Sequence, residues 1–312
     1  MDSLNRMAVE LVDEALDFAD ELNIAAYELD SGATVIDFGV EADGGLEAGL
    51  LLAEIQTAGL ATLQTRMDGV AGAPTPFVEL TTDHPGTALL GSQKAGWELD
   101  LEGFAGLGSG PARALVGEER EFAAIDYYDE FDLTVLCVES ATLPDDDVVA
   151  HVADRANVNE GAVFLPTTAL GSTAGSVTAA ARAAELAVFR LFELGYDPEN
   201  VASVAGSAPV APVSYDETEA MGRTNDALAY GGEVHLTVAT DEPDLFEQLP
   251  SSAADEHGRP FAEVFADAGY DFYEVDESVF APAAVTVDVR DGATYSFGET
   301  REDLLAESFD YE

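Results

Sequence analysis

The chain has 312 residues, of which 62 are Asp or Glu and 12 are Lys or Arg, so its formal net charge is −50. Hydrophobic residues make up 47% of the chain, which is enough to bury a substantial core and excludes a disordered acidic tail. A surface this negative repels phosphates, so binding to bare nucleic acid is excluded as well.

The charge predicts a protein adapted to very high salt. Acids spread over a globular surface repel one another in dilute buffer, whereas molar salt shortens the Debye length to about 3 Å and removes most of that cost. The cations indicate the same solvent, because the chain has eleven arginines and a single lysine, Lys94. An acidic protein from ordinary salt would keep more lysines, so we favour the halophilic interpretation.

The first 22 residues predict an acidic amphipathic helix rather than a signal peptide. No uninterrupted apolar run reaches about 18 residues, so we expect no membrane span. The only cysteine, Cys137, lies in the apolar run 133–138 and is expected in the core, which suits a reducing compartment. We therefore expect a cytoplasmic protein.

The remaining elements follow from hydrophobic periodicity. Helices are predicted at 7–22, 45–58, 146–156 and 176–194. Strands are predicted at 25–29, 34–38, 133–138, 163–166, 234–239 and 284–289.

Two pairs of predicted strands are joined by turn residues. Ser31-Gly32 joins 25–29 to 34–38, and Asp291-Gly292 joins 284–289 to 294–297. Hairpins near both ends argue against a purely parallel, doubly wound sheet and favour an α+β fold. The length suggests two lobes, 1–157 and 158–312, either of which can be discontinuous.

Five windows contain no acid, which is unusual in a chain where one residue in five is acidic. They are rich in Gly, Ser, Thr and Pro, and they cover 55–67, 84–97, 103–117, 161–184 and 200–215. Each window carries or precedes one cation, in chain order Arg66, Lys94, Arg113, Arg182 and Arg223. Buried core with structural arginines is one interpretation. We favour a pocket for an anionic ligand, from which acids are excluded because they would repel it.

The third window contains a glycine-rich block that includes Gly108, Ser109 and Gly110. Three glycines before Pro111, followed by Arg113, predict a loop with exposed amides at the start of a helix, which suits an anion. The block lacks the Gly-Lys-Ser/Thr of a P-loop.

Two further blocks carry candidate polar residues. The segment 166–172, with Thr167 and Ser172, leads into the helix that bears Arg182 and Glu185. The segment 206–209 is followed by 221–227, which contains Arg223, Asn225 and Asp226. The four histidines, His84, His151, His235 and His257, have no ligand-like spacing, so no metal site is expected.

Taken in order, these blocks resemble the methenyltetrahydromethanopterin cyclohydrolases, archaeal enzymes of one-carbon metabolism. The resemblance covers essentially the whole chain, from 31–37 to 280–283 and 308–309. One departure is Ser92, where many members have Cys.

The resemblance implies a reaction and a catalytic pair. In this family, water adds to the cationic methenyl carbon between two nitrogens of a reduced pterin, and one C–N bond breaks to leave an N5-formyl product. Because the carbon is already electrophilic, no cofactor is expected. Arg182 and Glu185, spaced i, i+3 on one helix face, match the family's catalytic Arg and Glu, which implies that Glu185 activates water and Arg182 assists. The alternative is a solvated ion pair.

The implied substrate carries a pterin at one end and an anionic tail at the other. The candidates for binding it are Lys94, Gly108, Ser109, Gly110, Arg113, Thr167, Ser172, Arg223, Asn225 and Asp226. A turn-forming Asn-Asp is an alternative for the last two residues.

The family also implies a two-lobed α+β subunit with mixed or antiparallel sheets, packed helices and a pocket between the lobes, assembled as a homotrimer. Two alternatives stay open from the residues. One is the same reaction on 5,10-methenyltetrahydrofolate, and the other is a non-catalytic pterin- or phosphate-binding protein.

Overall fold

The computed structural model describes residues 2–270 and 274–311. The chain divides into two compact units, each built from two separate stretches: Met1–Ala61 with Gly86–Thr178, and Thr62–Pro85 with Ala179–Glu312. Residue 157, where the sequence suggested a boundary, lies inside the first unit. No helix among the described residues is long and apolar enough to cross a bilayer.

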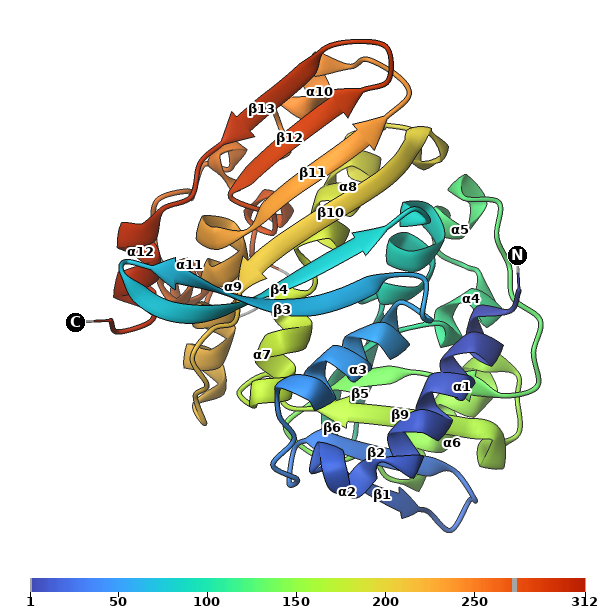
Figure 1. Ribbon diagram of the computed structural model, residues 1–312. Helices are drawn as coiled ribbons and strands as arrows, with labels where there is room; N and C mark the ends of the chain where they lie inside the picture. The colour runs from blue at the N-terminus through green and yellow to red at the C-terminus, as the bar shows by residue number, and fades with distance from the viewer. Residues whose placement is uncertain (1, 271–273, 312) are drawn as a thin grey trace. The chain divides into compact units, whose positions relative to one another are not determined.

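The first unit contains a seven-stranded mixed sheet with the path β1-β2-β9-β8-β6-β5, and β7 pairs with β9 (Figure 1). Strand β9 pairs in parallel with β2, β7 and β8, and the other pairings are antiparallel. The strands are β1 Ala25–Glu28, β2 Thr34–Gly39, β5 Trp97–Leu101, β6 Phe104–Ser109, β7 Thr134–Val135, β8 Cys137–Glu139 and β9 Val163–Thr168.

Helices cover both faces of this sheet. Neighbouring residues of a strand point to opposite faces, so adjacent residues of β2 pack against different helices. Ile36 packs in one cluster with α1 and α3, whereas Val35 packs in a second cluster with α6. The helical segments are α1 Leu4–Asp17, α2 Ala19–Leu22, α3 Leu46–Gln56, η1 Gly86–Gln93, α4 Ala112–Val116, α5 Arg120–Ala124, α6 Asp146–Ala156, η2 Glu160–Ala162 and α7 Thr173–Ala180. The division between the units falls within α7. Cys137 is buried as predicted, and burial raises the pKa of its thiol.

The second unit contains a six-stranded sheet in the order β13-β12-β11-β10-β4-β3, in which only β11 and β12 pair in parallel (Figure 1). The strands are β3 Thr62–Val70, β4 Ala73–Thr82, β10 Val201–Pro209, β11 Glu233–Val238, β12 Ala284–Val289 and β13 Thr294–Gly298. The helical segments are α8 Ala183–Glu193, η3 Pro198–Asn200, α9 Glu217–Gly231, α10 Pro243–Phe246, η4 Ser251–Ala253, α11 Phe261–Asp267, η6 Glu277–Val279 and α12 Glu302–Ser308.

The fold class is α+β, as predicted. Both expected hairpins are present, β1 with β2 and β12 with β13. In the two turns, Gly32 and Asp291 adopt left-handed backbone conformations, with φ values of +84° and +57°. Gly adopts this conformation readily, and Asp does so more often than most residues. The predicted helix 146–156 and strand 284–289 are confirmed with the same bounds.

Candidate functional site

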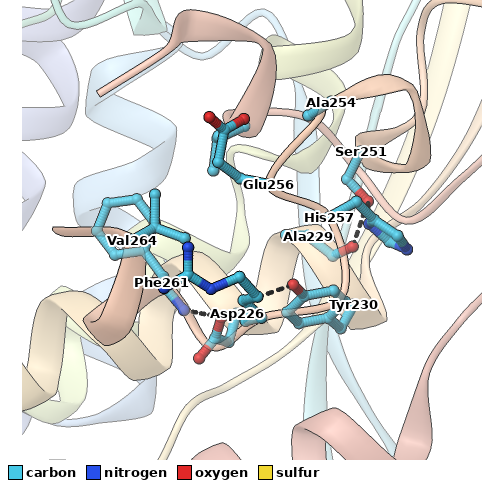
Figure 2. Close-up of a pocket in the computed structure, with 11 residues that line it drawn as sticks. Asp226, Ala229, Tyr230, Ser251, Ala254, Glu256, His257, Phe261 and Val264 are labelled. Carbon is cyan, nitrogen blue, oxygen red and sulfur yellow. Dashed lines mark hydrogen bonds between the residues drawn. The ribbon is translucent and has the colours of Figure 1, made fainter. Parts of the chain in front are cut away.

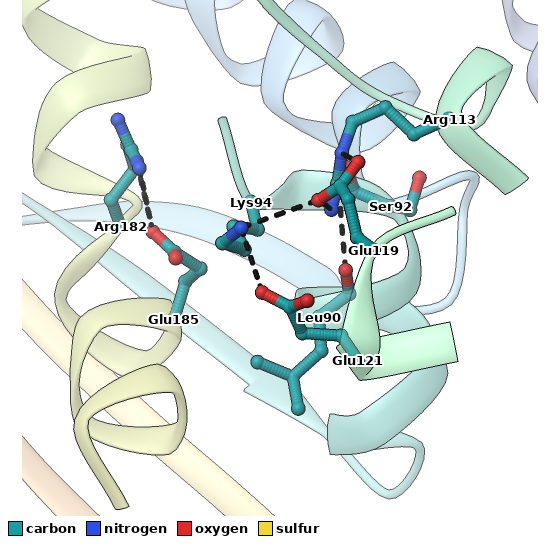
Figure 3. Close-up of polar contacts among 8 residues, drawn as sticks. All are labelled: Leu90, Ser92, Lys94, Arg113, Glu119, Glu121, Arg182 and Glu185. Atoms are coloured by element: carbon teal, nitrogen blue, oxygen red, sulfur yellow. Dashed lines mark hydrogen bonds and ion pairs between the residues drawn. The ribbon is translucent and has the colours of Figure 1, made fainter. Parts of the chain in front are cut away.

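The expected catalytic pair lies at the start of α8. Arg182 is the N-cap residue of this helix and Glu185 lies in its first turn. Nε of Arg182 donates to Oε2 of Glu185 at 3.0 Å, and Nη2 forms an ion pair with the same oxygen at 2.9 Å (Figure 3). The continuous helix predicted over 176–194 is wrong, because α7 ends at Ala180 and α8 begins at Ala183. Because of this break, Arg182 lies at the N-terminal end of α8 rather than inside a helix, and its side chain reaches Glu185 from there.

Burial separates this pair from an ordinary surface ion pair. The side chain of Glu185 is 1% exposed and that of Arg182 is 25% exposed. A buried carboxylate needs a partner, and the start of a helix favours negative charge. Among the described residues, Oε1 of Glu185 receives no hydrogen bond. One carboxylate oxygen is therefore held, while the other retains its capacity to accept a proton.

A glycine sets how deeply α8 packs against the sheet of the second unit. Helix α8 lies against β10 and β11. A Cβ on Gly206 of β10 would approach the backbone nitrogen of Ala184 to 2.8 Å, which is closer than such contacts occur. The sheet therefore has no side chain at the point where it meets the first turn of α8, the turn that carries Glu185.

In the first unit, Lys94 follows the π-helix η1 and is bound by two carboxylates. Its Nζ lies 2.7 Å from Oε1 of Glu121 and 3.3 Å from Oε2 of Glu119 (Figure 3). Glu119 also accepts from Arg113, whose Nε lies 3.0 Å from Oε1 and whose Nη2 lies 2.5 Å from Oε2. Arg113 is fully buried. Its side chain therefore has structural partners within the unit, and its binding of substrate stays a prediction.

The other cations that mark the acid-free windows are also paired with acids. Arg66 contacts Asp68 and Glu79, and Arg223 contacts Glu219 and Asp310. A stretch without acids in the sequence is thus not a region without acids in the fold, because carboxylates reach the cations from other positions. The expectation that acids are excluded from the surroundings of these cations is therefore wrong.

The glycine-rich block is a strand and not the predicted loop. Gly106 and Gly108 lie in β6; both pair with β5, and Gly108 also pairs with β8. A Cβ on Gly108 would lie 3.1 Å from the side chains of Leu136 and Trp97, so close packing explains this glycine. Gly110 turns the chain with φ +96° into α4, and its amide donates to the carbonyl of Ser92 at 2.8 Å. That amide is therefore not open to an anion.

Three candidate hydroxyls of the first unit have internal partners. Thr167, which is fully buried, donates to the carbonyl of Leu165 at 3.0 Å. Ser172 donates to the carbonyl of Ala169 at 2.8 Å, and Ser109 accepts from the side chain of Gln56 at 3.2 Å. Their contact with substrate stays a prediction.

The three candidates of α9 lie in the interior of that helix, so the alternative of an Asn-Asp turn is wrong. Nε of Arg223 donates to the carbonyl of Ser308 at 3.2 Å, which ties α9 to the end of α12. Nδ2 of Asn225 donates to the carbonyl of Met221 at 2.9 Å. These contacts stabilise the second unit. Substrate binding by Arg223 and Asn225 stays a prediction.

Asp226 is 1% exposed and accepts from the amide of Phe261 at 2.8 Å, at the first residue of α11. It lines a small cavity together with Tyr230, Ser251 and His257 (Figure 2). Burial, opposed by its hydrogen bonds, raises the pKa of Asp226 to about 7. Asp226 therefore joins α9 to α11 through this hydrogen bond.

Sequence reasoning missed Glu119 and Glu121. They follow the third acid-free window closely, but nothing in the local sequence indicates that their partner is Lys94, some 25 residues earlier. Among the residues that the structure describes, no group of three or more His, Cys, Asp or Glu side chains gathers as metal ligands would.

The fold and the Arg182–Glu185 pair fit a hydrolase that activates water with a carboxylate. The family described as Cyclohydrolase (MCH) matches residues 3–309, and the chain belongs to this family. Proteins named methenyltetrahydromethanopterin cyclohydrolase from two strains of Halobacterium salinarum are each 61% identical over 309 residues, which cover 99% of both chains. One of the same name from Methanospirillum hungatei is 39% identical over 317 residues and covers all of both chains. The similarity to a halophile supports the salt adaptation inferred from charge.

Proposed function

We propose that the protein catalyses the reversible hydrolysis of 5,10-methenyltetrahydromethanopterin to the N5-formyl form, with Glu185 as the base and Arg182 as its partner. The main support for the proposal is that the two oxygens of the Glu185 carboxylate differ in their contacts. Its Oε2 accepts a hydrogen bond from Nε of Arg182 and forms an ion pair with Nη2, and its Oε1 accepts no hydrogen bond from the described residues. Relatives that match over the full length are named for this reaction.

The chemistry requires a base and a stabilising charge. Oxygen of a water molecule forms a bond to the cationic methenyl carbon while Oε1 of Glu185 accepts the proton. One C–N bond of the resulting adduct then breaks while its hydroxyl loses a proton and becomes the formyl carbonyl. The departing nitrogen takes up one proton, and the proton on Glu185 is released to solvent. Arg182 keeps the carboxylate in place and supplies donors for the oxygen that adds to the carbon. The carbon is electrophilic before water arrives, so this scheme uses only side chains of the protein.

The remaining candidates are proposed as substrate ligands, and they differ in what they can offer. Lys94 and Arg223 keep part of their side chains exposed, 14% and 12%. Arg113, Thr167 and Asp226 are buried, so any effect they have on binding is expected to pass through their neighbours. We further propose that the protein is cytoplasmic and acts as a homotrimer.

One assay separates this proposal from its alternatives. Loss of the near-UV absorbance of the methenyl group is followed in molar potassium salt, with tetrahydromethanopterin or tetrahydrofolate as the carrier. We expect turnover of the tetrahydromethanopterin compound and far less of the folate. Turnover of the folate alone would reassign the carrier, and turnover of neither would favour the binding protein.

A further inference from the structure

Four side chains of the first unit form a compact, charge-balanced group, which we call the Lys94 cluster: Lys94, Arg113, Glu119 and Glu121 (Figure 3). Two cations face two carboxylates, so the formal charges cancel. Their side chains are 14%, 0%, 18% and 4% exposed, respectively. Pairs this buried are held more firmly than surface pairs, because little water competes for them.

Arg113 anchors the segment that carries Lys94. Its Nη1 donates to the carbonyls of Leu90 and Ser92, both at 3.2 Å, at the end of the π-helix η1. Long π-helices are rare and occur often at functional sites. A Cβ on Gly96 would lie 2.6 Å from both Nε of Arg113 and Oε2 of Glu119. The backbone on both sides of Lys94 is thus fitted around the Arg113–Glu119 pair.

Glu119 connects this anchor to the ammonium. Both of its oxygens accept from Arg113, and Oε2 also accepts from Lys94. Burial opposes ionisation of Glu119, but Arg113 and Lys94 hold its pKa below the ordinary value. Glu121 binds the ammonium from its own position, with Oε1 2.7 Å from Nζ. Lys94 is therefore held by two carboxylates that belong to α5 or its N-cap.

We propose that Glu119 and Glu121 are positioning residues: they hold the Lys94 ammonium in one place, with Arg113 as the anchor, and act on substrate binding only through Lys94. The inference rests on the proposed function, in which Lys94 binds substrate. A lysine has a long flexible stem. Fixing it before the substrate arrives lowers the entropy lost on binding.

A purely electrostatic account predicts the opposite effect, which makes the proposal testable. If the two carboxylates only weaken the positive field of Lys94, removing one would strengthen its attraction for an anionic tail. If they position the ammonium, removing one weakens binding although the cluster becomes more positive.

The experiment measures kcat and KM for methenyltetrahydromethanopterin in molar KCl for Glu119→Gln, Glu121→Gln and the wild type. Glu118→Gln is the matched control, because Glu118 is an exposed neighbour and its substitution changes the net charge equally. We expect KM to rise about tenfold in the first two variants, with kcat within about twofold and the control unchanged. A KM that stays constant or falls in both would overturn the proposal.

A double-substitution cycle tests whether the effect passes through Lys94. In a Lys94→Ala background, Glu119→Gln should change KM by less than about twofold, because its target is gone. An undiminished effect in that background would instead indicate a general structural role and refute the proposal. Glu121→Gln supplies the same cycle if Glu119→Gln does not fold. An inactive wild type would contradict the proposed function itself, whereas an active wild type with unaffected variants would contradict only the positioning role.

Discussion

Arg182 and Glu185 are joined through a single carboxylate oxygen. Two nitrogens of the guanidinium, Nε and Nη2, converge on Oε2 at 3.0 and 2.9 Å. A bidentate pair would use one nitrogen for each oxygen and occupy the whole carboxylate. The convergent arrangement instead fixes the orientation of Glu185 while Oε1 keeps its lone pairs, which is what a base needs.

Arg182→Lys should lower kcat by about 10- to 100-fold, although the charge is conserved. A lysine ammonium cannot place two donors from a rigid plane on Oε2, so Glu185 would lose its fixed orientation. Steady-state kinetics in molar salt provide the measurement, with circular dichroism as the check on folding. A kcat equal to that of the wild type would show that charge alone suffices at this position.

Gly206→Ala should lower both stability and kcat. The added Cβ would meet the backbone of Ala184 at 2.8 Å, which forces the first turn of α8 away from β10 and moves Glu185 with it. We expect a loss of about 1–3 kcal/mol in the free energy of unfolding and about a tenfold loss in kcat.

Gly69→Ala is the control for that substitution. Gly69 lies in β3 of the same unit, its φ is not positive, and a Cβ there would meet nothing within 4 Å. Its kcat should match that of the wild type. Equal losses in the two variants would contradict a specific role for the contact between Gly206 and α8.

Asp226→Asn should remove a pH-dependent loss of stability. Burial raises the pKa of Asp226 from 3.8 to about 7, so between these values the folded protein keeps a proton that the unfolded chain has released. The free energy of unfolding therefore falls as the pH rises from about 4 to 7 and levels off above about 7. The amide can still accept from Phe261 and does not titrate.

Urea unfolding at constant molar KCl measures this effect as the difference between Asp226→Asn and the wild type. The variant should gain stability relative to the wild type from pH 5 to pH 8, by on the order of 2 kcal/mol. The many exposed acids contribute equally to the pH dependence of both proteins, so their contribution cancels in this difference. A difference that stays constant over this range would show that Asp226 is ionised throughout.

Dilution of salt should dissociate or unfold the protein. The formal charge of −50 produces repulsion within each chain, and between the chains of the proposed trimer, that only a short Debye length suppresses. Light scattering and circular dichroism through a series from molar to about 0.1 M KCl should show loss of assembly, structure or both. A trimer that persists at the lowest salt would contradict the salt adaptation.

The sequence predicted elements well where the signal is local. The helix at Asp146–Ala156 has an aspartate N-cap, Asp145, and a left-handed Asn157 at its end, and both of its bounds were predicted. The hairpin of β12 and β13 has Asp291-Gly292 in its turn. Cap and turn residues fix such ends by contacts within a few positions of the chain.

The sequence failed where distant strands or charges decide. Gly106 and Gly108 suggested a loop, yet pairing with β5 and β8 makes them part of a strand. The break in the predicted helix 176–194 lies among residues that all favour helix, so propensity gave no sign of it. The i, i+3 spacing of Arg182 and Glu185 was sufficient to predict that their side chains pair, whereas their catalytic role stays a prediction. The carboxylates around Lys94 were missed because ion pairs between distant positions leave no local pattern.

The most direct test of the central claim is the turnover number of Glu185→Gln on methenyltetrahydromethanopterin, measured in molar potassium salt. Glu193→Gln, at the other end of α8, serves as the matched control. A glutamine has the size of Glu185 and can accept from Arg182, but it cannot take a proton from water. We predict a kcat at least about 100-fold below the wild type in a folded protein, with Glu193→Gln unaffected. A near-normal kcat for Glu185→Gln would contradict the role of Glu185 as the base.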